Sequence, residues 1–235
     1  MGGSQTRIVE ALEGLDNVEV VIYEPTCQYP NVSKRAGVHE LTPARALISE
    51  LIRRYSVMGF DCSLLEVQKL AWFFERYVKL FGLKNPMQLE FSAGRYGPYA
   101  NRLDRLLNSL DGSYLYSEKR IPDADPTDLV QFNYKHKETI AAYLGTGEAK
   151  TYLEALDKAS ELIDGFESPM GMELLATIDW LIHEEGRRPT LEDIRDGIDN
   201  WPAGAASAAR KQGMFSDRQI ELALRRVQSS GLYTM

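Results

Sequence analysis

The sequence contains few of the residues that build disulfide scaffolds or zinc sites. Of its 235 residues, two are cysteines, Cys27 and Cys62, and three are histidines. Two cysteines exclude a disulfide framework and also a Cys₄ or Cys₂His₂ zinc site. No two of His39, His136 and His183 have the spacing of metal ligands, so no metal site is predicted.

Long apolar runs and an excess of positive charge are also absent. The longest apolar run lies near 70–74 and is far shorter than the ~20 residues that span a bilayer. Against 27 Lys and Arg stand 34 Asp and Glu, and the net charge of −7 disfavours wrapping of a phosphate backbone over the whole surface. We therefore expect a cytoplasmic location, no membrane partner, and no nucleic-acid partner for the main domain alone.

The sequence pattern divides the chain into three parts. Residues 7–22 combine apolar residues at helical spacing with a strand-like run at 18–22, which predicts one helix and one strand. Two such elements cannot bury a core alone. We therefore expect residues 1–25 to be the truncated αβ remnant of a domain that begins upstream, 26–40 to be a polar linker and 41–235 to be the main domain.

The main domain is predicted to be α+β, predominantly α-helical with a small antiparallel sheet. Thr42-Pro43 is typical of a helix start, and Ser63 with Glu66 forms a capping box before a second, more apolar helix. Leu103, Leu106, Leu107 and Leu110 predict a third helix. Strands are expected over 87–92, 114–117 and 129–132, and further helices over 136–144, 149–164, 170–185, 190–199 and 216–230.

Charge is distributed unevenly along this domain. Residues 41–110 carry 10 basic and 6 acidic side chains, residues 111–200 carry 9 and 20, and residues 201–235 carry 5 and 2. One interpretation is a set of solvated helix faces. The other is an acidic surface that meets a basic partner, such as the groove of a nucleic-acid-binding protein.

Catalytic signatures are not found in the sequence. It has no nucleophile elbow, no P-loop and no dinucleotide-binding glycine motif. Adjacent carboxylates such as Glu184-Glu185 point apart on a helix and make poor acid/base pairs. We therefore expect no catalytic residue, no cofactor, and a chain that is not an enzyme.

Two segments nevertheless have a specific composition. Gly94–Ala100 contains two tyrosines, two glycines, a proline and Arg95, which is typical either of an exposed interface hot spot or of a tight loop whose tyrosines cap the core. Gly165–Trp180 contains a helix that Ser168-Pro169 opens, which is either a core helix or part of an interface. The sequence leaves both alternatives open.

A third possibility is a DNA-binding tail. Residues 190–200 and 216–229 could form a helix-turn-helix unit with a basic side, which carries Arg210, Lys211, Arg218, Arg225 and Arg226. The intervening residues 201–215 are too many for a three- or four-residue turn, so this remains a minor alternative, a DNA-binding autoregulator.

Four ordered motifs lie in the main domain, Leu41–Ala46, Leu65–Phe73, Tyr96–Ala100 and Gly165–Trp180. Together they resemble the C-terminal domain of the DarG antitoxins, over about residues 42–233. The unit ending at 20–25 resembles the last helix and strand of the macrodomain that precedes this domain in the family.

This resemblance implies a partner and a mode of inhibition. In the family, the toxin DarT is an NAD-dependent ADP-ribosyltransferase that modifies thymidine in single-stranded DNA. The macrodomain of the antitoxin removes that modification, and its C-terminal domain binds DarT and blocks the DNA site. The glycine-rich loops and catalytic lysine of the macrodomain have no counterpart here, so no hydrolase activity is expected of this chain.

A domain that blocks a DNA groove would place carboxylates where phosphates bind and aromatic rings where bases stack, which is DNA mimicry. The acidic half of the domain and the tyrosine loop contain both ingredients. The predicted partner-binding residues are Arg95, Tyr96, Tyr99, Arg102, Glu167, Met170, Glu173, Asp179, Glu184 and Glu185.

Overall fold

The structure is a computed structural model, and it describes residues 40–56 and 61–233. The helix and strand predicted within residues 7–22 lie outside the described residues, as does nearly all of the predicted linker. Among the residues described, no helix is long and apolar enough to cross a membrane.

The structure confirms the predicted fold class, because helices dominate and the sheets are small and antiparallel. The larger sheet has the order β1-β5-β4, with Cys62 opposite Val130 and Leu115 opposite Phe132. The smaller one is a two-stranded hairpin. The strands are β1 (Cys62–Ser63), β2 (Ser92–Gly94), β3 (Gly97–Tyr99), β4 (Leu115–Ser117) and β5 (Leu129–Phe132).

Helix α3 (Leu64–Leu80) is the centre of the molecule, and nearly all of its residues are buried. It begins at the predicted capping box, in which the Ser63 side chain accepts from the amide of Glu66 and the Glu66 carboxylate accepts from the amide of Ser63. Helix α2 (Pro43–Tyr55) starts at Thr42 as predicted and packs on α3.

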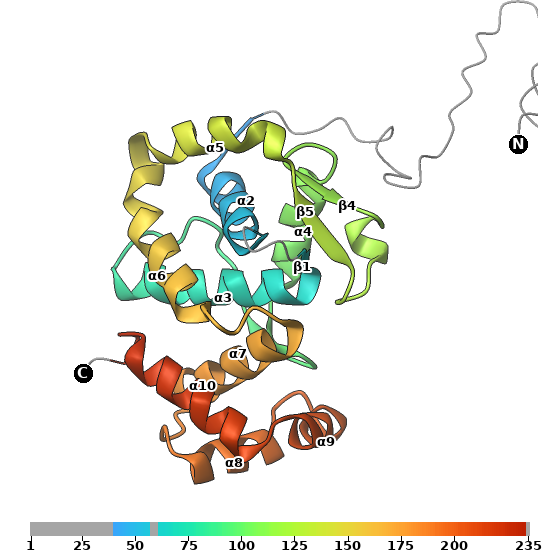
Figure 1. The fold of residues 1–235 in the computed structure, drawn as a ribbon, viewed down its shortest axis with the longest axis vertical. Helices are drawn as coiled ribbons and strands as arrows, with labels where there is room; N and C mark the ends of the chain where they lie inside the picture. Colours follow the sequence, from blue (N-terminus) through green and yellow to red (C-terminus); the bar gives the residue numbers. More distant parts are fainter. Residues whose placement is uncertain (1–39, 57–60, 234–235) are drawn as a thin grey trace, which may run out of the picture.

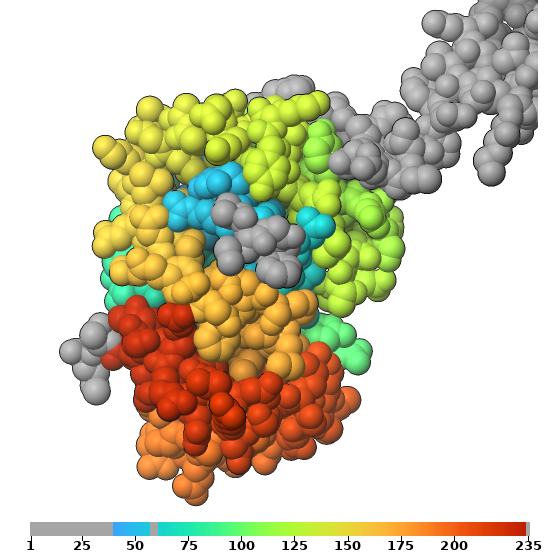
Figure 2. Space-filling model, in the orientation of Figure 1, coloured from blue at the N-terminus to red at the C-terminus, as the bar shows by residue number. Residues whose placement is uncertain are grey.

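Two groups of helices cover α3 from opposite sides (Figure 1). On one side α2 lies between the larger sheet and the outer helices α5 and α6, and on the other side α7 separates α3 from α8, α9 and α10. In the space-filling view these groups form one continuous body (Figure 2). Their bounds are α4 (Asn101–Leu110), α5 (Lys137–Leu144), α6 (Leu153–Ile163), α7 (Pro169–His183), α8 (Leu191–Asp199), α9 (Ala205–Met214) and α10 (Asp217–Ser229).

Short 3-10 turns complete the connections, and helix caps fix several of the boundaries. The turns are η3 (Ile121–Asp123), η4 (Tyr134–His136) and η5 (Gly147–Tyr152). The side chains of Ser168, Thr190 and Ser216 cap α7, α8 and α10, because each accepts a backbone N–H three residues on.

Two predicted elements are wrong. The strand expected over 87–92 is a non-regular segment, because the Asn85 carboxamide accepts from the amides of Met87 and Gln88 and turns the chain there. The segment expected to connect the last two helices contains α9, whose small residues Ala205, Ala208 and Ser207 gave no clear helical stripe. Met87 and Leu89 are both buried, so the apolar residues alternate there because they contact the core and not because the segment pairs as a strand.

Candidate functional site

The tyrosine loop is the turn of the β2–β3 hairpin, in which Gly94 pairs with Gly97 and encloses Arg95 and Tyr96. Gly97 has φ +96°, a left-handed conformation that glycine adopts without strain. Arg95 is exposed, and Tyr96 is half-buried. The hairpin therefore holds an aromatic ring and a guanidinium at a tightly fixed turn.

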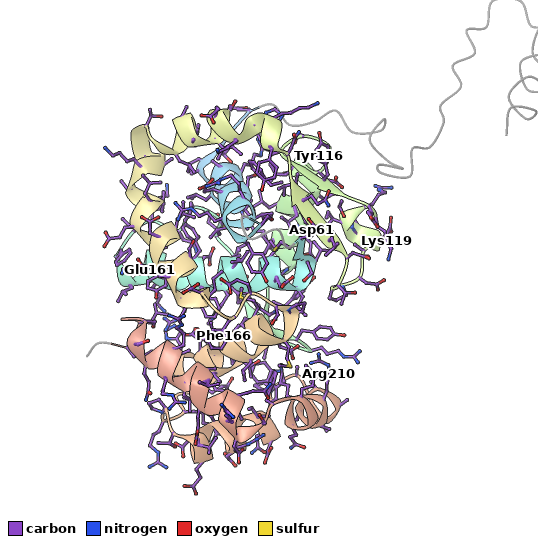
Figure 3. The ribbon with its side chains drawn as sticks, viewed as in Figure 1. Asp61, Tyr116, Lys119, Glu161, Phe166 and Arg210 are labelled. Carbon is purple, nitrogen blue, oxygen red and sulfur yellow. The ribbon has the colours of Figure 1, made fainter. Side chains whose placement is uncertain are left out.

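Two cations hold the Tyr96 ring. The guanidinium carbon of Arg210 lies 4.6 Å from the ring centroid and that of Arg95 lies 5.4 Å from it. Arg210 rises from α9 toward the hairpin (Figure 3). On the same side of the hairpin, Trp201 donates its indole N–H to the Gly94 carbonyl at 2.9 Å. The C-terminal helices thus support the hairpin through cation–π and hydrogen-bond contacts.

Helix α3 holds the hairpin from the other side through two consecutive polar residues. The Gln68 carboxamide accepts from the Ala100 amide at 2.9 Å and donates to the Ala100 carbonyl at 3.2 Å. The Lys69 amine donates to the Pro98 carbonyl at 2.8 Å. The motif Leu65–Phe73 therefore binds the backbone of the motif Tyr96–Ala100, which explains why the two occur together.

Gly97 is the hairpin position where side chains of α3 and α7 lie close to the backbone. An added Cβ would lie 3.3 Å from Cε of Lys69 and 3.5 Å from Oγ1 of Thr177. We expect Gly97→Ala to destabilise the protein by about 1–3 kcal/mol, since it combines backbone strain with crowding of Lys69. Urea unfolding measures this. Gly82→Ala is the control, because Gly82 also has positive φ but nothing lies within 4 Å of its added Cβ; an equal loss at both positions would show that crowding contributes nothing.

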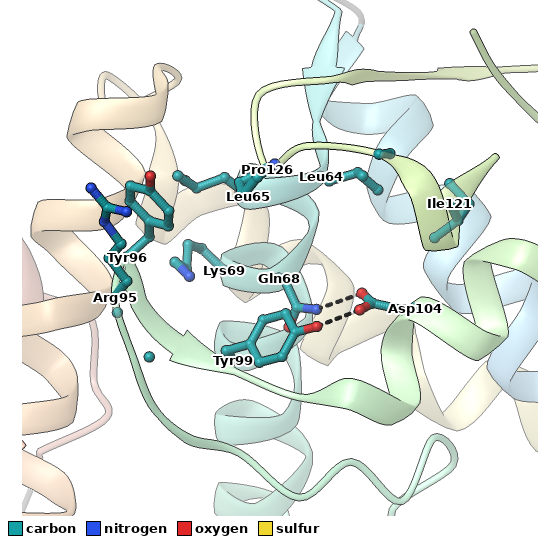
Figure 4. Close-up of a pocket in the computed structure, with 13 residues that line it drawn as sticks. Leu64, Leu65, Gln68, Lys69, Arg95, Tyr96, Tyr99, Asp104, Ile121 and Pro126 are labelled. Atoms are coloured by element: carbon teal, nitrogen blue, oxygen red, sulfur yellow. Dashed lines mark hydrogen bonds between the residues drawn. The ribbon is translucent and has the colours of Figure 1, made fainter. Parts of the chain in front are cut away.

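A cavity of about 280 Å³ lies between the hairpin, the first turns of α3 and the segment 121–126 (Figure 4). Its floor carries a closed polar set, in which Tyr99 donates to Asp104 and Gln68 donates to Asp104 at 3.1 Å. Apolar side chains form most of its wall. They include Leu64, Leu65, Ile121, Ala124 and Pro126.

Lys69 is the buried cation of this cavity, and it lacks a counter-ion within the described part of the chain. Its side chain is buried, and its amine forms no ion pair with any carboxylate of the described residues. Burial lowers its pKa to about 7, and the nearby Lys211 ammonium acts in the same direction, whereas Glu173 opposes them. Lys69 is thus partly unprotonated near neutral pH.

Two of the predicted partner-binding residues, Glu173 and Asp179, are in the interior. Glu173 is 1% exposed and Asp179 is 0% exposed, so neither can touch a partner directly. The prediction fails for both because charge in a sequence does not tell whether a carboxylate faces water or a buried cation.

Each of these carboxylates is the centre of an interior network. Glu173 accepts from Arg210 at 2.6 Å and from Lys211 at 2.7 Å, and Lys211 also donates to the Thr177 hydroxyl. Asp179 accepts from Trp72, Arg76 and Tyr233 at 2.7, 3.1 and 2.6 Å. Both networks join α7 to distant segments. The motif Gly165–Trp180 is therefore largely a structural one.

The remaining predicted residues are at the surface but not on one face. Arg95, Tyr96 and Tyr99 line the same cavity, and Tyr99 also lines a neighbouring hollow together with the exposed Arg102. Met170 and Glu184 lie near opposite ends of α7, about 20 Å apart along its axis.

The other two acidic residues mainly support their own loops. Glu167 accepts from the Gly165 amide at 2.7 Å, and Glu185 accepts from the Trp180 indole at 3.1 Å. The structure thus brings the predicted arginines and tyrosines together around two neighbouring hollows, and none of the predicted acids lines either one.

A second hollow lies beside α3 and the end of α7, and sequence reasoning missed it. Burial raises the pKa of Glu75 to about 7, and its carboxylate accepts from the Leu89 amide at 3.2 Å. His183 lines the same hollow, and burial lowers its pKa. Glu75 is a single acid on a helix with no motif around it, so only its burial identifies it.

Lys69 was missed for a related reason, since a lysine within an apolar helix is expected to extend to solvent. The helix-turn-helix alternative also loses one of its basic residues, because Lys211 is fully buried against Glu173 and cannot contact DNA. No group of three or more metal-ligating side chains occurs within residues 40–56 and 61–233.

No family model matches this chain. A protein of Thermus aquaticus is 36% identical over 185 residues, which is 77% of this chain and 48% of that protein. Proteins of Mycobacterium tuberculosis and Mycobacterium bovis are 31% identical over 242 aligned positions, 95% of this chain and 62% of theirs. All three are named DNA ADP-ribosyl glycohydrolase. The chain spans about half to three-fifths of the length of these relatives.

These comparisons contradict the expectation that the chain is not an enzyme. The relatives that align with 77% and 95% of the chain are named as hydrolases. The expectation depended on the absence of nucleophile and nucleotide-binding motifs, and on the absence of the glycine-rich loops and catalytic lysine of the macrodomain. Hydrolysis of a glycosidic bond requires none of these features, because a pair of carboxyl groups is sufficient in many enzymes.

Proposed function

We propose that this chain belongs to a DNA ADP-ribosyl glycohydrolase that serves as the antitoxin of a DarT-type DNA ADP-ribosyltransferase, and that its described domain binds the toxin. The observation that carries the proposal is the similarity to proteins of that name over 77–95% of the chain. The exposed part of the hairpin supports it, since Tyr and Arg dominate interface energetics.

A second surface carries negative charge that would complement the positively charged DNA groove of the toxin. The exposed carboxylates of α6 and of its C-cap, Asp164, recur every three or four residues and so form one stripe. Glu154 forms no ion pair among the described residues. The other three, Asp157, Glu161 and Asp164, pair with Arg54, Lys158 and Arg226. The stripe consists of Glu154, Asp157, Glu161 and Asp164. In this proposal the stripe takes the place of DNA phosphates, and the arginine-flanked hairpin is a separate contact.

Titration of the full chain into catalytically inactive DarT, with and without a thymidine-containing oligonucleotide, tests toxin binding. We expect tight binding that the oligonucleotide competes away. Binding that ignores the oligonucleotide would move the contact away from the DNA groove, and no binding would refute the proposal.

Truncation of the hairpin tip is expected to weaken toxin binding. Tyr96→Ala removes a ring that Arg95 and Arg210 hold in place, and a central interface tyrosine contributes about 2 kcal/mol, or roughly 30-fold in Kd. Calorimetry measures the change. Tyr134→Ala is the control, because Tyr134 is 56% exposed and remote from the hairpin; equal Kd values for the two variants would exclude the hairpin from the interface.

The hydrolase part of the proposal has a separate test. Release of ADP-ribose from an ADP-ribosylated thymidine oligonucleotide by this chain measures the activity directly. Glu75 is the described carboxyl whose pKa, raised to about 7, suits a general acid. Activity that Glu75→Gln abolishes would place the reaction in the hollow beside α3, and activity that persists would exclude Glu75.

A further inference from the structure

The charged side chains around the hairpin cavity are more often positive than negative. Arg95 is at its edge, Lys69 lies in its floor, and Lys211 and Arg210 lie behind the hairpin. One carboxylate, Glu173, serves both Arg210 and Lys211 at 2.6 and 2.7 Å. Lys69 receives no carboxylate from the described residues.

The other polar groups of the cavity are already satisfied. Gln68 uses both ends of its carboxamide on the Ala100 backbone, and it also donates to Asp104. Tyr99 donates to the second oxygen of Asp104. The Lys69 ammonium has three N–H donors, of which the Pro98 carbonyl takes one. Lys69 is therefore the buried group of this cavity with unused donors, and the exposed Arg95 is a second cation at its edge.

The shape and chemistry of the cavity limit what could compensate that charge. At about 280 Å³ it is at the lower end of ligand-site sizes, so it takes a fragment rather than a nucleotide. Its walls are leucine, isoleucine, alanine and proline side chains, together with the Tyr96 and Tyr99 rings. Among the described residues, Lys69 is the one cation within the buried part of the cavity, since Arg95 is exposed at the edge, and one buried amine balances one negative charge.

We propose that this cavity is a binding site for a compact carboxylate with an apolar or aromatic body, whose carboxylate pairs with the Lys69 amine and whose body contacts the Leu64, Leu65 and Tyr96 side chains. The site shares the Tyr96 side chain with the proposed toxin contact, but a small acid tests it in the absence of the toxin. The same chemistry has two sources, a free small acid and a carboxylate side chain or C-terminus of a partner.

Binding to this site takes up a proton. Lys69 has a pKa of about 7 in the empty cavity, and an adjacent anion raises it. Lys211 and Glu173 are the charged groups that act on Lys69 from α9 and α7, and Asp104 is held by Tyr99 on the opposite wall. We therefore expect the affinity for a carboxylate to fall about tenfold between pH 6 and pH 8 as Lys69 loses its proton.

Calorimetric titration of the full chain with phenylacetate tests the proposal, and the neutral phenylacetamide is the matched probe. We expect phenylacetate to bind with a Kd of about 0.1–1 mM, at least tenfold tighter than phenylacetamide, with proton uptake at pH 8. Equal affinity for the two probes, or no proton uptake, would overturn it. Tighter binding of thymidine 5′-monophosphate or inorganic phosphate would also overturn it.

Lys69→Met is expected to lose at least tenfold in affinity for phenylacetate and none for phenylacetamide. Lys79→Met is the control, because Lys79 is exposed on the same helix and does not line this cavity. If Lys69→Met does not fold, the pH dependence in the unmodified chain still decides the outcome. Displacement of phenylacetate by inactive toxin would identify a partner carboxylate as the source, and continued binding would identify a free acid.

Discussion

Replacement of Asp179 by alanine is expected to destabilise the protein by about 3–5 kcal/mol. Asp179 has no solvent exposure and accepts three hydrogen bonds, from Trp72, Arg76 and Tyr233. Its loss leaves the Arg76 guanidinium, whose side chain is 8% exposed, as a buried charge without a carboxylate.

Urea unfolding and thermal melts measure this loss, which corresponds to a Tm lower by ~10 °C in a chain of this size. Asp196→Ala is the matched control, because Asp196 pairs with Arg187 at the surface. The control is expected to unfold like the unmodified protein, since exposed ion pairs contribute little. If Asp179→Ala melted at the same temperature as the control, the buried network would not stabilise the fold.

The Asp179 network illustrates what the sequence could and could not predict about the fold. Caps are local, so Thr42 and Ser63 marked helix starts that the structure confirms. Helix α9 was missed because alanine and serine carry no apolar stripe. The strand expected over 87–92 was wrong because one Asn85 side chain overrides alternation.

The candidate site was only partly predictable, because its key contacts join segments that are distant in the sequence. The composition of Gly94–Ala100 marked the hairpin, and the turn geometry follows from its glycines. Nothing local links Lys69 to Pro98, 29 residues later, or Lys211 to Glu173, 38 residues earlier. The signs of these charges were visible in the sequence, but their pairing was not.

Three of the four motifs acquire one physical explanation from these long-range contacts. Gln68 and Lys69 of α3 hold the hairpin backbone. Thr177, from the motif Gly165–Trp180, lies against Gly97 of the hairpin. A substitution that moves one of these segments therefore disturbs the contacts of the others. The exposed remainder of the hairpin, Arg95 and the edge of Tyr96, is what this framework presents to a partner.

The second large loss of stability is expected at the buried ion pair of Glu173 and Lys211. A double-mutant cycle measures the coupling between the two side chains. Glu173→Met leaves the fully buried Lys211 ammonium without a carboxylate, beside Lys69, and we expect a loss of about 3–5 kcal/mol. Lys211→Met costs less, because Glu173 keeps Arg210 as its partner. The Trp201 and Phe215 rings, 4.8 and 5.7 Å from the Lys211 amine, also suit a methionine side chain.

The double variant is expected to recover most of the stability that Glu173→Met loses, because it removes the unpaired buried charge. Burial lowers the pKa of Lys211 below its ordinary value, and loss of Glu173 lowers it further. The unfolded chain then binds more protons than the folded one up to pH ~10.4, so the stability of Glu173→Met rises with pH toward that value. Urea unfolding at pH 7 and pH 9 measures both effects. Additive losses in the double variant, with no gain at pH 9, would show that Lys211 does not depend on Glu173 for its burial.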